Sequence, residues 1–180
     1  MSTPTLGRLQ TEPALSRADL LAPPVYDALS GWAYAAEVGV VEIDPQLADT
    51  AALSAAYDLP MSTGANCVVV GGRRDGAERI GACVVPADTR ADVNFLVKRT
   101  LDVRKCSFLS MDLAVDRSGM EYGGITPIGI PAGWRLFVDA AALEIEVAVI
   151  GSGVRRSKLL LPGRLLGLLP HAEVLAGLGT

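Results

Sequence analysis

The sequence predicts an α+β fold in a single domain, with a curved mixed β-sheet flanked by short helices. Half of the 180 residues are apolar, which is enough to build a sizeable core. Segments with strand-like composition come in several lengths and are mixed with short helical patterns, without an internal repeat. Glycine-rich turns between some of these segments indicate hairpins. This combination is typical of α+β domains.

Residues 1–22 differ in composition from the rest of the chain. They are rich in proline, serine and threonine and show only weak periodicity. We therefore expect them to form a partly ordered N-terminal arm. Residues 23–180 are expected to form the domain.

The first part of the domain gives signals for two helices and a strand. Proline is tolerated in the first helical turn, so Pro23 and Pro24 predict a helix start. The next apolar residues repeat at helical spacing, at Val25, Leu29, Trp32 and Ala36. A strand is expected over residues 38–44, followed by a helix that Asp49 or Thr50 caps and that ends near residue 57.

The rest of the chain is richer in strand signals. Two β-rich runs, residues 66–70 and 79–85, flank the glycine-containing segment 71–76, which predicts a hairpin with a longer loop. Asp92 can cap a helix that runs to about residue 100. The remaining elements are expected in the order strand 104–109, helix 111–117, strands 134–139, 146–151 and 157–161, and a last helix from Pro162 to about Leu168.

Charge is distributed unevenly along the chain. Residues 1–60 hold two basic and eight acidic side chains, whereas residues 61–180 hold fourteen basic and twelve acidic ones. The net charge of −4 argues against a protein that coats nucleic acid, and DNA is not an expected partner. Basic residues gather in short groups, which can contact a few phosphates or can belong to an ordinary solvated surface. These groups are Arg73-Arg74, Lys98-Arg99, Arg104-Lys105, and Arg155-Arg156 with Lys158.

No segment indicates a membrane protein. No apolar run approaches the ~20 residues that a membrane span needs. The N-terminal residues have neither the basic nor the apolar region of a secretory signal. We expect a soluble, cytoplasmic protein without a membrane partner.

The usual catalytic motifs are missing. His171 is the single histidine and has no nucleophilic serine motif to serve, so we expect it to pack or to lie on the surface. Glycine motifs for phosphates or dinucleotides are absent, and the scattered Cys67, Cys83 and Cys106 do not form a metal site. We expect these cysteines to be reduced and buried. No cofactor or metal is expected, so any catalysis would rely on backbone groups or on the substrate itself.

The most informative segment is the glycine–proline loop of residues 123–129, GGITPIG. Its adjacent glycines allow a positive φ or the close approach of a ligand. Pro127 stiffens the loop, and Thr126 before it is expected to be extended. Such a loop can present backbone N–H and C=O groups to a small ligand, although a tight turn between strands is the more common origin of such a pattern.

The order of these motifs resembles that of the YbaK/prolyl-tRNA synthetase-associated editing-domain family, whose members deacylate mischarged aminoacyl-tRNA. The resemblance covers about residues 25–175. Its most specific part is the segment 118–129, SGMEYGGITPIG, which is similar to the family's glycine loop. The segments 136–139, LFVD, and 149–153, VIGSG, resemble two later family strands, and Val84-Val85-Pro86 resembles an earlier one. The resemblance implies a barrel-like curved sheet.

One departure from the family concerns a lysine. Family members usually carry a lysine followed by a hydroxyl residue near the start of the strand that corresponds to residues 65–70, where this chain has Asn66 and Cys67. The family lysine would place a full charge near a phosphate or a developing oxyanion. Asn66 keeps an amide donor without the charge, and charge-assisted hydrogen bonds are about twice as strong as neutral ones.

The resemblance implies that the protein edits in trans, by hydrolysing the ester between an amino acid and the acceptor end of a tRNA. It implies a catalytic role for Asn66. Binding of the aminoacyl group is implied for the glycine loop and for a later glycine turn, at Gly123, Gly124, Ile125, Thr126, Pro127, Gly151 and Ser152. Two alternatives stay open: an impaired enzyme that binds aminoacyl-tRNA or a small ligand without turnover, and a module that binds a protein partner through the acidic N-terminal third. The amino acid, the tRNA and the oligomeric state do not follow from the sequence.

Overall fold

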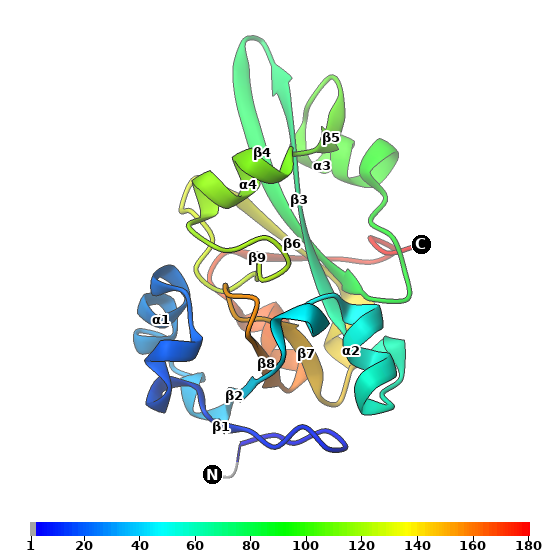
Figure 1. Cartoon of the computed structure of the whole chain (residues 1–180). Helices are drawn as coiled ribbons and strands as arrows, with labels where there is room; N and C mark the ends of the chain where they lie inside the picture. Colours follow the sequence, from blue (N-terminus) through cyan, green and yellow to red (C-terminus); the bar gives the residue numbers. More distant parts are fainter. Residues whose placement is uncertain (1–2) are drawn as a thin grey trace.

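Strand pairing divides the protein into two β-sheets, as Figure 1 shows for a computed structural model that describes residues 3–180. The smaller sheet has the strand order β1-β2-β8-β7 and is antiparallel. The larger sheet has the order β5-β3-β4-β6-β9 and is mixed, because β6 runs parallel to both of its neighbours. The strands are β1 Glu12–Pro13, β2 Gly39–Glu42, β3 Ala65–Arg74, β4 Ala77–Pro86, β5 Cys106–Phe108, β6 Arg135–Asp139, β7 Ala148–Gly151, β8 Ser157–Leu161 and β9 Ala172–Leu175.

The helices are short and lie around the sheets. The α-helices are α1 Pro23–Ser30, α2 Thr50–Tyr57, α3 Lys98–Leu101 and α4 Met111–Ser118, and a π-helical turn, η6 Val93–Val97, leads into α3. Short 3₁₀ segments connect other elements: η1 Ala14–Ser16, η2 Ala18–Leu20, η3 Ala35–Glu37, η4 Pro45–Leu47, η5 Met61–Thr63, η7 Ala140–Glu144 and η8 Gly163–Leu168. None of the helices in the described part of the chain is both long enough and apolar enough to cross a membrane.

The predicted α+β class and the mixed sheet are confirmed. The expectation of one curved, barrel-like sheet needs correction, because two sheets are present and neither closes on itself within residues 3–180. The two sheets meet where Gly64, just before β3, bridges to Val149 of β7. One large hydrophobic cluster draws on strands of both sheets and on Val25 and Leu29 of α1.

The β3–β4 hairpin is longer than predicted. Its ten-residue strands are joined by a two-residue turn at Asp75 and Gly76, whose φ angles of 51° and 81° suit a type I′ turn. The expected long loop is therefore wrong. Gly71 and Gly72 belong to the strand because β5 packs directly beside them, and a Cβ on Gly72 would collide with the Lys105 carbonyl.

Helix boundaries follow the predicted caps in two places. Asp49, and not Thr50, caps α2 by accepting from the backbone N–H groups of Ala51 and Ala52 at 3.0 and 3.2 Å. Asp92 caps the turn that leads into α3. By contrast, α1 ends at Ser30 before Trp32, and the predicted last helix is the 3₁₀ segment η8.

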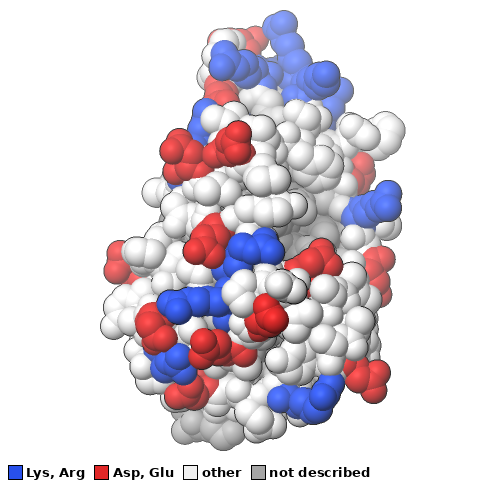
Figure 2. Space-filling view, in the orientation of Figure 1, with Lys and Arg blue, Asp and Glu red and all other residues white. Residues whose placement is uncertain are grey.

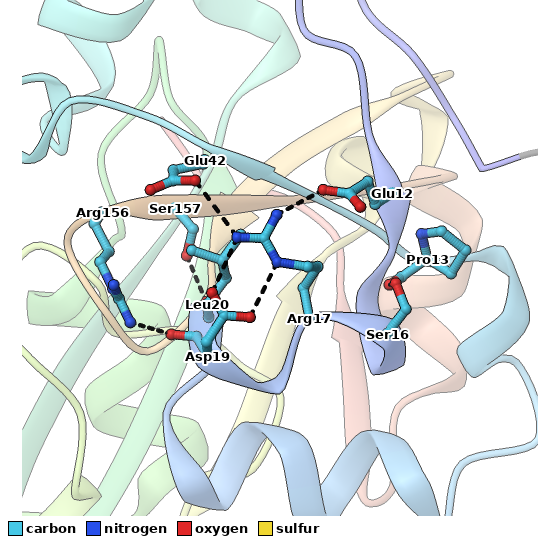
Figure 3. A network of polar contacts seen from close by, with 9 residues as sticks. All are labelled: Glu12, Pro13, Ser16, Arg17, Asp19, Leu20, Glu42, Arg156 and Ser157. Carbon is cyan, nitrogen blue, oxygen red and sulfur yellow. Dashed lines mark hydrogen bonds and ion pairs between the residues drawn. The ribbon is translucent and has the colours of Figure 1, made fainter.

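The N-terminal segment packs against the smaller sheet. Leu9, Ala14 and Leu20 in this segment are completely buried or almost so. Figure 3 shows Arg17 bridging three carboxylates, with ion pairs of 2.6 Å to Glu12, 2.9 Å to Asp19 and 3.4 Å to Glu42. Ser157, the first residue of β8, donates to the Leu20 carbonyl at 2.5 Å. Residues 3–22 therefore hold the beginning of β8 in place; the division into an arm and a domain at residue 22 stays a prediction.

Candidate functional site

A pocket of about 270 Å³ lies at the junction of the two sheets. Its walls come from the start of α2, the start of β3, the beginning of the glycine–proline loop, the end of β7, and one residue of β8. Its size is slightly below the ~300–1,000 Å³ that is typical of drug-sized binding sites. The polar side chains that line it are Asp49, Thr50, Asn66, Tyr122 and Lys158, and the other lining residues are apolar or glycine.

Asn66 lies in this pocket together with Gly123, Ile125 and Gly151, three of the residues for which the resemblance implies binding. Its amide oxygen accepts a hydrogen bond of 2.7 Å from the hydroxyl of Thr50, the first residue of α2. The amide N–H groups of Asn66 have no protein acceptor within residues 3–180, so they are available as neutral donors to a ligand.

Lys158 is the cation of the pocket, and it was not among the predicted site residues. It stands opposite Gly151 in the β7–β8 register and is only 6% exposed. Its ammonium donates to the Ala48 carbonyl at 2.6 Å, just before the cap of α2. Two further N–H groups of this ammonium have no protein acceptor in the described part of the chain. An ammonium can therefore reach a ligand from β8 although none is present at position 66.

Burial lowers the pKa of Lys158 from its ordinary value of 10.5 to about 8. The loss of hydration is the main cause, because it disfavours the charged form. The carboxylate of Asp49 acts in the opposite direction, and the guanidinium of Arg155 adds to the lowering. At neutral pH the lysine still carries its charge, in surroundings where a charge acts strongly.

The structure splits the glycine–proline loop into two parts. Gly123, with a φ of 78°, and Ile125 line the pocket. Gly124 lies behind them, where a Cβ would come within 2.8 Å of the backbone of Val154. Thr126 and Pro127 are buried and do not line this pocket; Pro127 faces a separate apolar cavity of about 210 Å³.

The later glycine turn is divided in the same way. Gly151 lines the pocket, and its missing Cβ leaves room for the carbonyls of Gly124 and Ile125. Ser152 is fully buried, and its hydroxyl contacts the Ser157 hydroxyl at 2.7 Å. Of the residues for which the resemblance implies binding, Gly123, Ile125 and Gly151 thus line the pocket, while Gly124 and Ser152 lie behind its walls.

Arg155 lies beside Gly123, one of the residues that line the pocket. Its guanidinium donates to the carbonyls of Tyr122 at 3.0 Å and of Pro45 at 3.1 Å, and its backbone N–H donates to the Glu121 carboxylate at 2.6 Å. These bonds connect the glycine–proline loop to the segment before α2.

Other chemistry is not supported at this site. Burial raises the pKa of the Cys67 thiol to about 12, so this pocket residue is not a thiolate at neutral pH. All three cysteines are free; Cys83 and Cys106 are buried as predicted, whereas Cys67 is only partly buried because it lines the pocket. His171 lies at the apolar cavity beside Pro127. Within residues 3–180, no three histidine, cysteine or acidic side chains gather in a way that could hold a metal ion.

Comparison with known families decides the relationship. Residues 44–168 match the model of the aminoacyl-tRNA editing domain, which is more than half of the chain. The protein is a member of the aminoacyl-tRNA editing domain family. The matched residues include all walls of the pocket, from Ala48 to Lys158. No curated protein matches the sequence.

Solved structures show that this editing domain has a known fold. A proposed trans-editing enzyme for prolyl tRNA synthetase superposes with a TM-score of 0.72 at 17% identity, over 92% of this chain and 96% of that one. The hypothetical protein APE2540 gives a TM-score of 0.68 at 22% identity, over 78% of this chain and 90% of that one. At these identities the similarity establishes the fold alone.

Lys158 could have been found from a local signal in the sequence. It sits among basic residues, Arg155 and Arg156, which suggests a solvated group. However, it is also the second residue of the strand Ser157–Leu161, in which every residue is buried. A single charge inside an apolar run is a candidate for function, because burying a charge is costly without a purpose or a partner.

Proposed function

We propose that this editing domain hydrolyses the ester of a mischarged aminoacyl-tRNA in trans. The observation that supports this most is the position of Lys158, whose ammonium lines the same pocket as Asn66, Gly123 and Gly151. The resemblance implies a positive charge at the start of β3, where this chain has Asn66. Lys158 of β8 would then supply that charge. The cytoplasm remains the location that we expect.

In the proposed reaction, water attacks the ester carbonyl and forms a tetrahedral intermediate with an anionic oxygen. The bond between the carbonyl carbon and the ribose oxygen then breaks, which releases the amino acid and restores the ribose hydroxyl. Lys158 and the amide of Asn66 would donate to the anionic oxygen or to a phosphate next to it. A ribose hydroxyl of the tRNA would help to activate the water, because the pocket contains neither a histidine nor a thiolate and its carboxylate, Asp49, is engaged in capping α2.

Selection of the amino acid would depend on fit. Gly123 and Ile125 shape one wall. Gly124 lies so close to the backbone of Val154 that a Cβ would come within 2.8 Å of it, which leaves this wall little room to move outward. A pocket of about 270 Å³ suits a small or medium aminoacyl group. One methylene changes discrimination by only ~1–3 kcal/mol, so a size limit would be gradual.

Deacylation of a panel of mischarged tRNAs tests the proposal. We expect the wild-type protein to release at least one small amino acid faster than the spontaneous rate, and Lys158→Met to lose this activity while staying folded. Binding of aminoacyl-tRNA without turnover would instead identify the impaired enzyme, for which the neutral Asn66 speaks. Absence of both turnover and tRNA binding would leave the protein-interaction module.

A further inference from the structure

Three of the basic pairs noted in the sequence come together at one end of the molecule. Arg73 and Arg74 end β3, Lys98 and Arg99 lie on α3, and the third pair, Arg104-Lys105, precedes β5. A backbone hydrogen bond of 3.1 Å from the N–H of Arg104 to the carbonyl of Arg73 connects two of the pairs. We call these six residues the basic end. Figure 2 shows blue side chains gathered at the top of the molecule, where Figure 1 places the tip of the β3–β4 hairpin.

The charge of this end is in excess of its local partners. Residues 73–105 hold eight of the sixteen basic residues of the chain and five of its twenty acidic ones. Arg74 pairs with Asp102 at 3.0 Å, and Arg104 pairs with Asp75 at 3.2 Å. Within residues 3–180, the other four cations of the basic end, which are all exposed, have no carboxylate or hydrogen-bonding partner: Arg73, Lys98, Arg99 and Lys105.

The basic end also contains a hollow with an exposed aromatic ring. Arg74, Lys98 and Arg99 line a hollow of about 620 Å³ together with Phe95, whose side chain is 79% exposed. This ring is therefore open to a ligand that enters the hollow. Cations beside an exposed ring suit nucleic acid, whose phosphates take the charge and whose bases or sugars take the ring.

The hairpin sets the distance between the basic end and the pocket. Asn66 in the pocket and Arg74 at the tip belong to the same strand, β3. A strand extends by about 3.3 Å per residue, so the two lie roughly 26 Å apart. A tRNA has a short single-stranded 3′ end followed by the acceptor helix. With the aminoacyl group in the pocket, the single strand would span this distance and the helix would meet the tip.

We propose that the basic end binds the phosphates of the tRNA acceptor helix while the aminoacyl group occupies the pocket. This inference rests on the proposed function for its substrate. The contact is with the backbone and carries no base sequence. It would give this acidic protein a positive surface on the side from which the acceptor helix approaches.

The test uses the full chain and two RNA probes, an acceptor-stem minihelix with a single-stranded 3′ end and the 3′ single strand alone. The variants are Lys98→Gln/Arg99→Gln and Arg73→Gln/Lys105→Gln. The matched control is Arg8→Gln/Arg164→Gln, which removes the same charge from exposed positions outside the basic end. Thermal unfolding of all variants checks that they are folded.

We expect each variant of the basic end to bind the minihelix about tenfold more weakly than the control does. Its salt dependence should be shallower, with the slope of log K against log salt reduced by roughly 2 for two lost phosphate contacts. Binding of the single strand should not change. Phe95→Ala should weaken minihelix binding by a smaller factor and leave the salt slope intact.

Three outcomes would overturn the inference: variants that bind the minihelix as the control does, an equal loss on both probes, or wild-type binding to vesicles of anionic lipid without binding to RNA. Failure of the proposed function is a different result. In that case the minihelix binds through the basic end although no mischarged tRNA is deacylated.

Discussion

Strand β3 begins in a pocket with a few buried polar groups and ends at a surface crowded with exposed cations. At its start, Asn66 is neutral and accepts a hydrogen bond from Thr50, and the buried amine of Lys158 lines the same pocket. At its end, Arg73 and Arg74 are exposed to water. The same strand therefore joins two kinds of electrostatic environment.

Buried and exposed cations interact with a ligand in different ways. A buried ammonium acts at short range and is hardly screened, because little water surrounds it. The attraction of exposed cations is screened and falls off over about 10 Å at 0.1 M salt, but several of them together still attract a polyanion. We therefore propose catalysis at the first end and attraction of a polyanion at the second. The predictions below test this division.

The largest expected effect comes from moving the charge of the pocket. Lys158→Met should reduce kcat of deacylation by about 10²–10³, which is the usual cost of losing one oxyanion donor. Adding Asn66→Lys to this variant should restore part of the activity, since it returns an ammonium to the pocket from the opposite side. Measuring kcat and KM for the single and double variants checks this.

The matched control for this experiment is Lys158→Arg, which keeps a charge but changes its shape. If the substitutions at Lys158 change KM alone, its charge interacts with a phosphate of the substrate. If they change kcat alone, its charge acts on the reacting carbonyl. Full activity of Lys158→Met would end the distinction between the two ends of β3.

The second effect concerns stability and pH. Between about pH 8 and pH 10.5 the folded protein has lost the proton of Lys158, whereas the unfolded chain still holds it. The unfolded state then binds more protons, so the free energy of unfolding rises with pH in this window. Between these limits, the free energy of unfolding of the wild type should rise by up to about 3 kcal/mol relative to that of Lys158→Met. Urea unfolding of both proteins at several pH values measures it, and parallel curves would show that the amine titrates normally.

A third prediction concerns the wall behind the pocket. Gly124→Val should destabilise the fold by about 1–3 kcal/mol, because its side chain would meet the backbone of Val154 within 2.8 Å. Gly133→Val is a suitable control, since nothing lies within 4 Å of a Cβ there. Thermal unfolding compares the two. Equal stability of the variants would mean that the wall yields, and the pocket would then select amino acids less sharply than we propose.

The smallest effect is expected at Asn66. Asn66→Ala removes a neutral donor and should lower kcat by about tenfold, less than the loss of the charged donor. Thr50→Val releases the amide of Asn66 without removing it, so its effect should be in the same direction and smaller. Deacylation rates of the two variants decide this. A larger loss for Thr50→Val than for Asn66→Ala would show that the hydroxyl itself acts on the substrate.

Much of the fold was predictable because local signals agreed with tertiary packing. The caps at Asp49 and Asp92 and the α+β class follow from composition and spacing alone. The length of the hairpin did not, since Gly71 and Gly72 resemble a loop until β5 packs beside them. Strand β9 escaped notice because it pairs only with distant β6, and its sequence, AEVL, is too short to be distinctive.

The sequence pointed to several residues that line the pocket but not to Lys158. The glycine–proline loop and Asn66 do meet in one pocket. Lys158 lies 92 positions further along the chain than Asn66 and is brought to it only by the junction of the two sheets. Spacing within a motif cannot report such a meeting. Thr126 and Ser152 stood inside the right motifs, yet packing turned them away from the pocket.

The hydroxyl of Ser157 has a consequence for how the chain can be shortened. It donates to the carbonyl of Leu20, and it also contacts the hydroxyl of Ser152. Cutting the chain at residue 22 would remove this carbonyl. It would also remove the guanidinium of Arg17, which pairs with three carboxylates. The Ser157 hydroxyl would then lose its carbonyl acceptor and keep only the Ser152 hydroxyl as a partner, next to the residue that carries the buried amine. The activity of a protein shortened at residue 22 would thus show how strongly the N-terminal segment supports the start of β8 and Lys158, which follow it by more than a hundred positions.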